Sequence, residues 1–315
     1  MRRVIVLGAS GFFGGLIYNR LQQAGLNPLA ASRSSGDFRI DANDGASIRA
    51  SIKTRDVVVD AAGPFHTRTP ALIQAARTIG FDVIDISDSP EYTGMIYEQQ
   101  APISAAGIRV LTACSSLSAV SALMTKTTGI DQPKKLTVYL VPASRYTANR
   151  GAVTSYLSGV TGESRTLHFP HPVGTRSGIT VKSVDSVTLP RIFPSLQSAE
   201  FVVDAGTPGG NLIARFKGAR DLMQKHQDKM LKLAKRIGPK QGVLAYDITT
   251  TGRRRQFVYT GEQTYLIAVI PAIDAAIAIA NARFTPKGIV PPTQHMSLES
   301  FRVAVEREEI QTIAV

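Results

Sequence analysis

Tryptophan is absent from this sequence of 315 residues, and cysteine occurs only once. A single cysteine excludes an internal disulfide and a zinc site built from several thiolates, so we expect an intracellular, cytoplasmic protein. Acidic residues are also scarce, with 24 Asp and Glu against 36 Lys and Arg. Because 43% of the residues are apolar and 19% are charged, the composition excludes a disordered chain.

Long apolar runs are missing as well. The longest, Tyr265–Ala282, contains Pro271 and Asp274, so we expect no membrane-spanning helix. The N-terminus resembles a signal peptide in its basic residues and apolar stretch, but Gly8 and Gly11 interrupt that stretch. The same segment is better explained as the start of a nucleotide-binding domain.

The positive charge is concentrated in the middle of the chain. Residues 1–118 hold 11 basic and 10 acidic residues, residues 119–285 hold 22 and 10, and residues 286–315 hold 3 and 4. A change in charge along a chain often coincides with a change of domain. We therefore predict a nearly neutral domain over 1–118, a basic domain over 119–285 and a separate C-terminal segment over 286–315.

A glycine-rich turn separates the first predicted strand from the first predicted helix. The β-branched run Arg3–Leu7 is typical of a buried parallel strand, and apolar residues after the turn recur at helical spacing. Gly8 permits a tight turn, Gly11 lets backbone approach a pyrophosphate, and Gly14 lets the helix pack on the strand. This context predicts a dinucleotide-binding site; the alternative is a glycine-rich turn without a ligand.

The end of the second predicted strand indicates which dinucleotide is bound. A carboxylate there would bind the ribose 2′-hydroxyl of NAD, but this chain has Ser32, Arg33 and Ser34. Arginine can neutralise a 2′-phosphate and serine hydroxyls can bind its oxygens, so we expect NADP rather than NAD. The alternative is that Arg33 is a solvated loop residue.

Strand-like and helix-like runs continue to alternate through the first domain. Asp44 is placed to cap a helix over Gly45–Lys53, and Asp56–Ala62 and Phe81–Ser87 are typical of buried strands. This alternation predicts an α/β fold with a Rossmann-type, doubly wound parallel sheet. The candidate cofactor-binding residues are Gly8, Ser10, Gly11, Phe12, Phe13, Gly14, Ser32, Arg33, Ser34, Asp41 (toward the adenine amino group), Ala61, Ala62, Gly63, Pro64 and Phe65.

These motifs, in this order, resemble the cofactor domain of the saccharopine dehydrogenase-like (saccharopine reductase) family. The most specific part is Asp60-Ala-Ala-Gly-Pro-Phe65 followed by Asp85-Ile-Ser-Asp88, whereas the Tyr-x-x-x-Lys pair of short-chain reductases is absent. The tail, with Thr285-Pro-Lys-Gly288 and Ser297–Val305, is similar to the segment that returns to the cofactor domain in that family. The resemblance implies a hydride-transfer enzyme acting on an imine, amine or carbonyl, or on a lipid-type enoyl group.

The middle domain has the pattern of a mixed or antiparallel sheet with helices, an α+β domain. Lys135–Val141 is a predicted strand, Ile179–Val187 and Phe201–Val203 are shorter ones, and 243–249 with 256–260 form a predicted hairpin. Domains of this kind usually carry a substrate site or a dimer contact, so we expect a homodimer and a small-molecule substrate, with an anionic substrate as one option.

Hydride transfer requires little of the protein beyond positioning the reactants and supplying a proton. Asp88, at a strand end, and Tyr146 are our candidates for that proton. Arg145 and Arg150 could hold a substrate carboxylate through paired hydrogen bonds. A helix cap, a surface tyrosine and ordinary surface charge are the respective alternatives. The histidines show no metal-ligand spacing, so we expect no metal.

The basic excess is greatest in residues 215–240, with nine basic and two acidic residues. Leu222, His226, Met230, Leu233 and Ile237 have helical spacing and predict one helix, about 219–237, packed on the core. Three interpretations of its charge follow: a solvated basic face, which we favour, then an anionic substrate or membrane surface, and last nucleic acid, which we do not expect. The residues concerned are Lys225, Lys229, Lys232, Arg236 and, at the predicted hairpin tip, Arg253, Arg254 and Arg255.

The sequence thus predicts an NADP-dependent oxidoreductase of saccharopine dehydrogenase-like type. A cofactor-binding regulator or scaffold without turnover is the first alternative, because no catalytic constellation is evident. An enoyl reductase acting at a membrane surface is the second.

Overall fold

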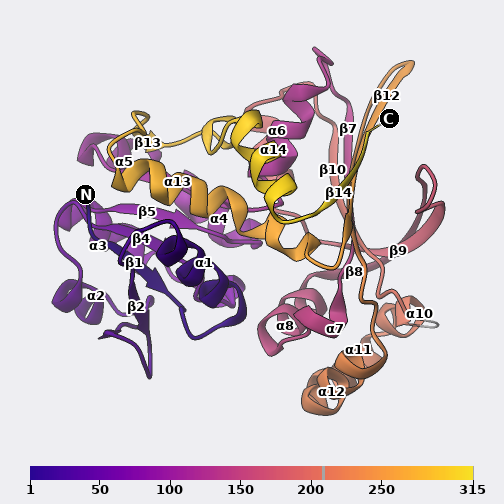
Figure 1. Ribbon diagram of the computed structural model, residues 1–315, viewed down its shortest axis with the longest axis horizontal. Helices are drawn as coiled ribbons and strands as arrows, with labels where there is room; N and C mark the ends of the chain where they lie inside the picture. The colour runs from indigo at the N-terminus through magenta and orange to yellow at the C-terminus, as the bar shows by residue number, and fades with distance from the viewer. Residues whose placement is uncertain (208–209, 315) are drawn as a thin grey trace. The chain divides into compact units, whose positions relative to one another are not determined.

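The computed structural model describes residues 1–207 and 210–314, and the chain divides into two units. The first unit contains residues 1–120 and 268–301, and the second contains residues 121–267 and the tail from residue 302. Each unit is built on one seven-stranded sheet (Figure 1).

The sheet of the first unit is parallel and has the strand order β13-β6-β5-β4-β1-β2-β3. Its core order, 3-2-1-4-5-6 in chain sequence, is that of doubly wound dinucleotide-binding folds, which confirms the predicted fold class. β1, β4 and β5 are buried at every position, as expected for strands covered on both faces. The strands are β1 (Val4–Leu7), β2 (Leu29–Ser32), β3 (Phe38–Arg39), β4 (Val57–Asp60), β5 (Asp82–Asp85), β6 (Arg109–Leu111) and β13 (Gly288–Ile289).

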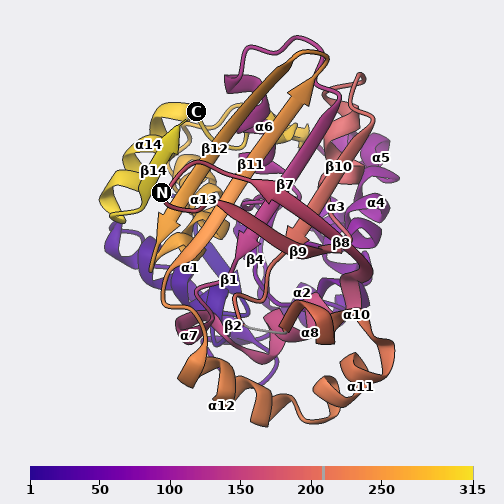
Figure 2. The ribbon, with the colours of Figure 1, turned by 90° about the vertical axis from the view of Figure 1, so that its right-hand side faces the viewer.

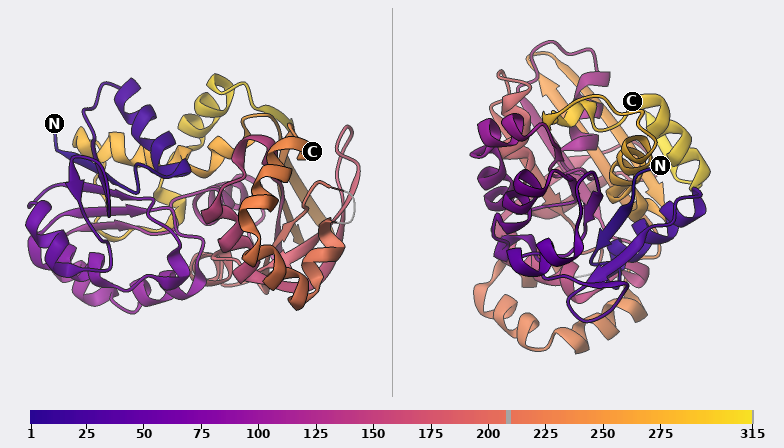
Figure 3. Two further views of the ribbon diagram at one scale, coloured as in Figure 1. Left: turned by 90° about the horizontal axis from the view of Figure 1, so that it is seen from below. Right: turned by 90° about the vertical axis from the view of Figure 1, so that its left-hand side faces the viewer.

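Helices cover both faces of this sheet. α1 and α13 are neighbours, and α3 contacts both α2 and α5; Figure 3 shows the indigo α1 and orange α13 on one side and the purple helices on the other. The helices are α1 (Phe12–Gln23), α2 (Gly45–Ser51), η1 (Phe65–Thr67), α3 (Ala71–Ile79), α4 (Pro90–Tyr97), α5 (Gln100–Ala106), α13 (Ile270–Ala280) and η4 (Pro292–Gln294). α6 (Ala119–Thr127) and α14 (Leu298–Arg307) cross the division between the units.

The second unit contains a mixed sheet with the order β14-β12-β11-β7-β10-β9-β8, in which only β7 and β10 are parallel (Figure 2). This matches the predicted α+β architecture. The strands are β7 (Lys135–Val141), β8 (Val160–His168), β9 (Thr175–Val181), β10 (Ser198–Val203), β11 (Gly242–Thr250), β12 (Arg253–Gly261) and β14 (Gln311–Ala314). The helices are α7 (Ser144–Thr147), α8 (Arg150–Gly159), α9 (Asp185–Thr188), η2 (Leu189–Arg191), α10 (Gly210–Arg215), α11 (Lys217–Lys225), α12 (Gln227–Ile237) and η3 (Thr264–Ala268).

The structure assigns the end of the predicted domain 119–285 and the tail 286–315 to the two units differently from the prediction. α13, placed by the sequence in the domain 119–285, belongs to the first unit, where it contacts α1 and β4. It is apolar almost all round, so it needs cover on more than one side. The tail 286–315 does not simply return to the first unit, because β13 joins the first sheet while β14 pairs with β12. Pairing with β14 satisfies the backbone groups that β12 would otherwise expose.

The prediction of one core-packed helix over 219–237 is wrong, because the segment forms two helices and neither has a buried residue. His226 has φ −109° and ψ 33°, and it ends α11 and precedes α12. Apolar spacing defines one face only along a continuous helix, so the five residues do not form a single buried stripe. No side chain of either helix is buried. In the same way, the predicted strand 179–187 is divided, because Val181 ends β9 and residues 185–188 form α9.

Candidate functional site

The glycine-rich turn between β1 and α1 has the geometry that dinucleotide binding requires. Gly8 has φ +78°, a left-handed conformation that favours glycine, and its N–H donates to the Ala31 carbonyl over 2.7 Å. The Gly11 N–H then donates to the Gly8 carbonyl over 2.8 Å and closes the turn. A Cβ added to Gly8 would lie 2.8 Å from the carbonyl oxygen of Ala61. The turn is therefore packed directly on the loop that follows β4.

Gly14 determines how closely α1 approaches this turn. A Cβ at position 14 would lie 2.0 Å from the Gly8 carbonyl oxygen and 2.5 Å from its carbon. Real Cβ atoms essentially never make such contacts, so the helix can reach this position only with glycine. By contrast, a Cβ at Gly15 would lie 3.4 Å from its nearest neighbour, the Ala9 carbonyl oxygen. The packing of α1 on the turn thus requires glycine at position 14 but not at position 15.

No side chain caps the N-terminus of α1 from the N-cap position. Its N-cap residue, Gly11, provides no side-chain hydrogen bond, and the first turn contains no acidic residue. Ser10 and Gly11 are exposed, whereas Phe12 and Phe13 are half-buried and form an edge-to-face pair. Backbone N–H groups and the positive end of the helix dipole favour a phosphate at such a position.

The segment after β2 exposes the arginine that the sequence assigns to a 2′-phosphate. Arg33 and Ser34 are exposed. The hydroxyl of Ser32 is used within the protein, since it donates to the Ser35 carbonyl over 2.8 Å and accepts from the Ser35 N–H over 2.9 Å. Ser32 therefore shapes the turn that presents Arg33, and the second hydroxyl of the predicted set, Ser34, remains at the surface.

Asp41 and Asp44 shape the start of α2. The Asp44 carboxylate accepts from the N–H groups of Ala46 and Ser47 over 2.9 and 3.3 Å, which confirms the predicted cap. Asp41, the candidate for the adenine amino group, accepts from the Asn43 N–H over 2.9 Å, and its own N–H donates to Ser47 over 3.0 Å. Asp41 is half-buried, and its carboxylate is engaged at least in part within this loop.

A buried ion pair holds the loop after β4. Arg68 donates to the Asp60 carboxylate over 2.5 Å and to the Ala62 carbonyl over 3.0 Å, and the Ala62 N–H donates to Asp60 over 3.0 Å. Asp60 has no exposed surface and Arg68 is 7% exposed. Burial raises the pKa of Asp60, and the facing guanidinium opposes that rise. This pair fixes Ala61 and Ala62, with the exposed Gly63 and half-buried Pro64 beyond them, at the carboxyl edge of the sheet.

Two aromatic rings complete the surroundings of Arg68. Its guanidinium lies 5.7 Å from the ring centroid of Phe65 and 5.8 Å from that of Tyr92. Phe65 is buried, so this candidate cofactor residue acts mainly as packing for the loop. Burial also raises the pKa of Tyr92 well above its ordinary value, so Tyr92 stays neutral. The arrangement stabilises the buried cation through the faces of both rings.

A second buried carboxylate connects the ends of β5 and β6. Asp85 accepts from the Ser87 N–H over 3.0 Å and from the Ala113 N–H over 2.9 Å. Burial raises the pKa of Asp85 to about 7, although these two hydrogen bonds oppose the rise. Asp85 therefore pins together the two loops that follow these strands. Cys114, next in the second loop, is buried with its pKa raised by burial, and this is not the environment of an activated thiol.

Asp88, the first predicted proton donor, lies in the loop between β5 and α4 and is half-buried. It does not cap α4, because Ser89 occupies that position and accepts from the Tyr92 N–H over 3.2 Å. The alternative interpretation of Asp88 as a helix cap is therefore wrong. Its position at the carboxyl end of a parallel strand is the one at which ligands of such sheets collect.

The other three predicted residues lie in the second unit. Tyr146 is 41% exposed, and partial desolvation with a hydrogen bond to Glu262 raises its pKa. Arg150 binds both carboxylate oxygens of Asp228 over 2.6 and 2.7 Å. Arg145 donates from Nε to the Gly238 carbonyl over 3.3 Å. Both arginines thus contact α12 or the residue that ends it, and each already has a partner within the protein.

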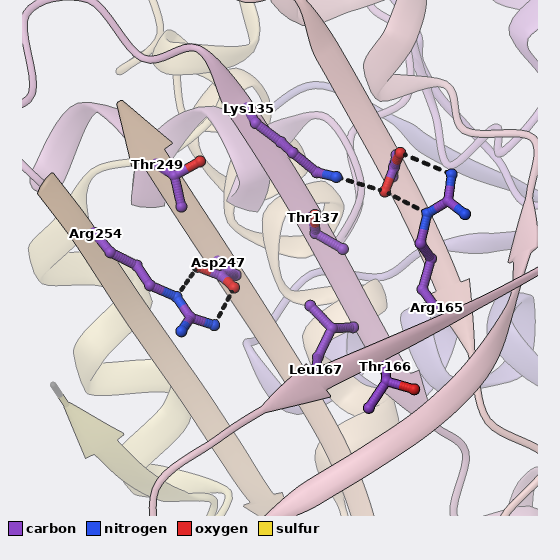
Figure 4. Close-up of a pocket in the computed structure, with 9 residues that line it drawn as sticks. Lys135, Thr137, Arg165, Thr166, Leu167, Asp247, Thr249 and Arg254 are labelled. Carbon is purple, nitrogen blue, oxygen red and sulfur yellow. Dashed lines mark hydrogen bonds and ion pairs between the residues drawn. The ribbon is translucent and has the colours of Figure 1, made fainter. Parts of the chain in front are cut away.

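A polar hollow of about 310 Å³ lies on one face of the second sheet (Figure 4). Glu200 accepts from Lys135 over 3.0 Å and from Arg165 over 3.3 Å, while Arg254 binds Asp247 through two hydrogen bonds of 2.6 and 2.9 Å. Although burial opposes it, the hydrogen bonds from Arg165 and Lys135 lower the pKa of Glu200. Every cation of this hollow therefore has a carboxylate partner, and Arg254 of the hairpin tip is engaged there.

Arg68 and the role of Asp85 were not predicted from the sequence. Asp60 and Asp85 each end a fully buried strand, and a carboxylate at a buried position needs a cation or several donors. That rule could have pointed to Arg68, the only Lys or Arg in residues 56–76. Among the described residues, no group of three His, Cys, Asp or Glu could hold a metal ion, and no helix has the length and apolarity needed to cross a membrane.

No protein-family model and no curated protein matches the chain. Among solved structures, it is similar to the WlbA dehydrogenase of Thermus thermophilus in complex with NAD and alpha-ketoglutarate, at 9% identity and TM-score 0.43 over 96% of this chain and 94% of that chain. It is also similar to the dehydrogenase MviM of Clostridium difficile, at 8% identity and TM-score 0.42 over 98% and 99% of the two chains. An oxidoreductase of Sinorhizobium meliloti follows, at 11% identity and TM-score 0.41 over 99% of each chain.

Proposed function

We propose that the protein is an NADP-dependent oxidoreductase of saccharopine dehydrogenase-like type, which transfers hydride to or from a small imine, amine or carbonyl substrate. The observation that carries this proposal is the cradle formed by Gly8 and Gly14, where any side chain at position 14 would meet the Gly8 carbonyl. It stands at the end of β1, an inner strand of the doubly wound sheet between β4 and β2, and the N-cap residue of the following helix makes no side-chain hydrogen bond. These features fit the pyrophosphate of a dinucleotide.

The preference for NADP rests on the segment after β2. Arg33 and Ser34 are exposed there, and residues 29–36 contain no carboxylate that could accept from a ribose 2′-hydroxyl. A guanidinium can bind a phosphate through two parallel hydrogen bonds, which would favour the 2′-phosphate of NADP.

The bound cofactor would supply the hydride chemistry, and the chain would supply position and a proton. Within the first unit, Asp85 and the Asp60–Arg68 pair fix the loops along the carboxyl edge of the sheet. We propose Asp88 on this edge, and Tyr146 in the second unit, as candidates for proton transfer. Arg145 and Arg150 remain candidates for a substrate carboxylate, although a substrate would compete with their present partners.

Cofactor binding tests the proposal directly. Fluorescence titration with NADPH and NADH should give tighter binding of NADPH. Arg33→Ala should weaken NADPH binding roughly 10- to 100-fold, the equivalent of one charge-assisted contact, and should change NADH binding little. Lys53→Ala removes the same charge beside the amino end of β4 and serves as the control. Affinity for neither cofactor would refute the proposal, whereas a preference for NADH would remove only the role of Arg33.

Turnover separates an enzyme from a regulator or scaffold. NADPH oxidation would be followed with keto acids plus amines, and with enoyl substrates. Steady-state turnover in the first group supports the proposed chemistry, and turnover in the second alone would reassign it to an enoyl reductase. Asp88→Asn and Tyr146→Phe would then be compared, since loss of the proton donor lowers kcat about 100-fold or more.

A further inference from the structure

The helices α11 and α12 expose large apolar side chains, which are uncommon on a helix face that contacts only water. Phe216, just before α11, is 62% exposed, and Leu222 within α11 is 58% exposed. In α12, Leu233 and Ile237 are 47% and 56% exposed. These four are among only seven large apolar side chains that are exposed in the described part of the chain. Such clustering on one short segment marks an interaction surface.

The same segment is strongly cationic. Residues 215–240 carry nine basic and two acidic side chains, and one of the two acidic ones, Asp228, is paired with Arg150. The basic residues are Arg215, Lys217, Arg220, Lys225, Lys229, Lys232, Lys235, Arg236 and Lys240. In the described ranges, Lys225, Lys229, Lys232 and Arg236 are exposed and have no ion-pair partner. Their charge is therefore available to an external anion.

Apolar and basic side chains lie side by side on each helix. In α12, Leu233 and Ile237 are one turn apart, Lys229 precedes Leu233 by one turn, and Arg236 follows it by three residues. In α11, Lys225 follows Leu222 by three residues. An exposed apolar margin flanked by cations is the pattern of a helix that lies in the interface of a lipid bilayer.

The opposite side of α12 is fixed to the second unit. Asp228 is bound by Arg150, Gln227 donates to Thr154 over 2.8 Å, and the Gly238 carbonyl accepts from Arg145 over 3.3 Å. Figure 2 shows α10, α11 and α12 following one another along one end of this unit. On this side of α12, Met230, Leu231 and Ala234 are half-buried. Leu233, Ile237 and the cations are exposed to solvent.

We propose that α11 and α12 form a docking surface for an anionic lipid bilayer. Charge complementarity selects this partner: a second copy of the same surface would bring like charges together, and phosphate recognition by cations alone would not account for the exposed Leu222, Leu233 and Ile237. At a bilayer, the apolar side chains enter the acyl boundary and the flanking cations bind acidic headgroups.

The absence of tryptophan makes insertion directly measurable, because a single introduced tryptophan is the only one in the protein. Leu233→Trp should show a blue shift of its emission on addition of vesicles containing phosphatidylserine and phosphatidylcholine, and none with phosphatidylcholine alone. Val303→Trp, at a position 53% exposed on α14, is the matched control and should not shift. An unchanged Leu233→Trp spectrum, or equal shifts at both positions, would overturn the proposal.

Vesicle sedimentation tests the charge requirement. Lys229→Gln/Lys232→Gln should lower partitioning to phosphatidylserine vesicles on the order of 10- to 30-fold, and high salt should do the same. Arg253→Gln/Arg255→Gln removes the same net charge from the hairpin tip and should bind like the wild type. Equal losses in both variants would indicate non-specific attraction and would overturn the proposal. Binding of a DNA duplex that depends on Lys229 and Lys232, without vesicle binding, would also overturn it.

Discussion

Alanine at position 14 should abolish the close approach of α1 to the glycine turn. The added Cβ would lie 2.0 Å from the Gly8 carbonyl oxygen, whereas unstrained carbon contacts are about 3.5 Å or longer. The turn or the helix must therefore move by about an ångström or more. Overpacking of this kind costs about 1–3 kcal/mol of stability. Backbone donors to the pyrophosphate would be displaced as well, and loss of one or two charge-assisted contacts would weaken NADPH binding roughly 10- to 100-fold or more.

Alanine at position 15 is the matched control, on the same helix and one residue away. Its Cβ would lie 3.4 Å from its nearest neighbour, an ordinary contact. Because alanine favours a helix over glycine by about 1 kcal/mol, Gly15→Ala should raise stability slightly and leave NADPH binding unchanged. Denaturant unfolding and fluorescence titration measure the two quantities. The result that would refute this reasoning is a Gly14→Ala variant with wild-type stability and wild-type affinity for NADPH. Position 14 would then not require glycine for the packing of α1 on the Gly8 turn.

Three further predictions concern charged groups. The pKa of Asp85 is about 7 in the folded protein against about 3.9 when unfolded, so the folded state holds an extra proton between these values and its stability falls as pH rises from about 4 to about 7. Asp85→Asn should therefore stabilise the protein by about 2–3 kcal/mol more at pH 8 than at pH 5 in urea unfolding, and a pH-independent difference would contradict this assignment. Arg68→Ala should cost about 3–5 kcal/mol in the same assay, because it leaves Asp60 charged and buried, and Asp60→Asn/Arg68→Met should recover much of that loss. Arg150→Ala should cost at most about 1 kcal/mol, because its ion pair with Asp228 is mostly exposed; a larger loss would show that the pair anchors α12 more strongly than screened charges can.

The elements of the first unit were predictable because their determinants are local. The strand, turn and helix around Gly8 and Gly14 follow from residues within a single stretch of chain. The cap supplied by Asp44 likewise depends on a side chain and two N–H groups that are at most three residues away. A periodic pattern and a capping residue act over a few residues, so they can be read without knowing what packs on them.

The partners of the charged residues were not predictable in this way. The sequence predicted that Arg145 and Arg150 bind a substrate, but they contact groups that lie 93 and 78 residues later in the chain. Asp85 receives a hydrogen bond from Ala113, which follows a different strand. Spacing along the chain gives no information about such contacts, because they depend on which helices and strands become neighbours in the fold.

The sequence by itself determined the doubly wound sheet, the glycine turn at the end of β1 and the exposed Arg33, since these depend on short-range sterics, helix capping and hydrophobic periodicity. Only the tertiary structure decided that α13 joins the first unit, that β14 joins the second sheet, and that Leu222, Leu233 and Ile237 are exposed. An apolar stripe specifies that a helix face prefers to be covered. Whether another part of the same chain covers it depends on long-range packing, which leaves Leu222, Leu233 and Ile237 exposed on α11 and α12.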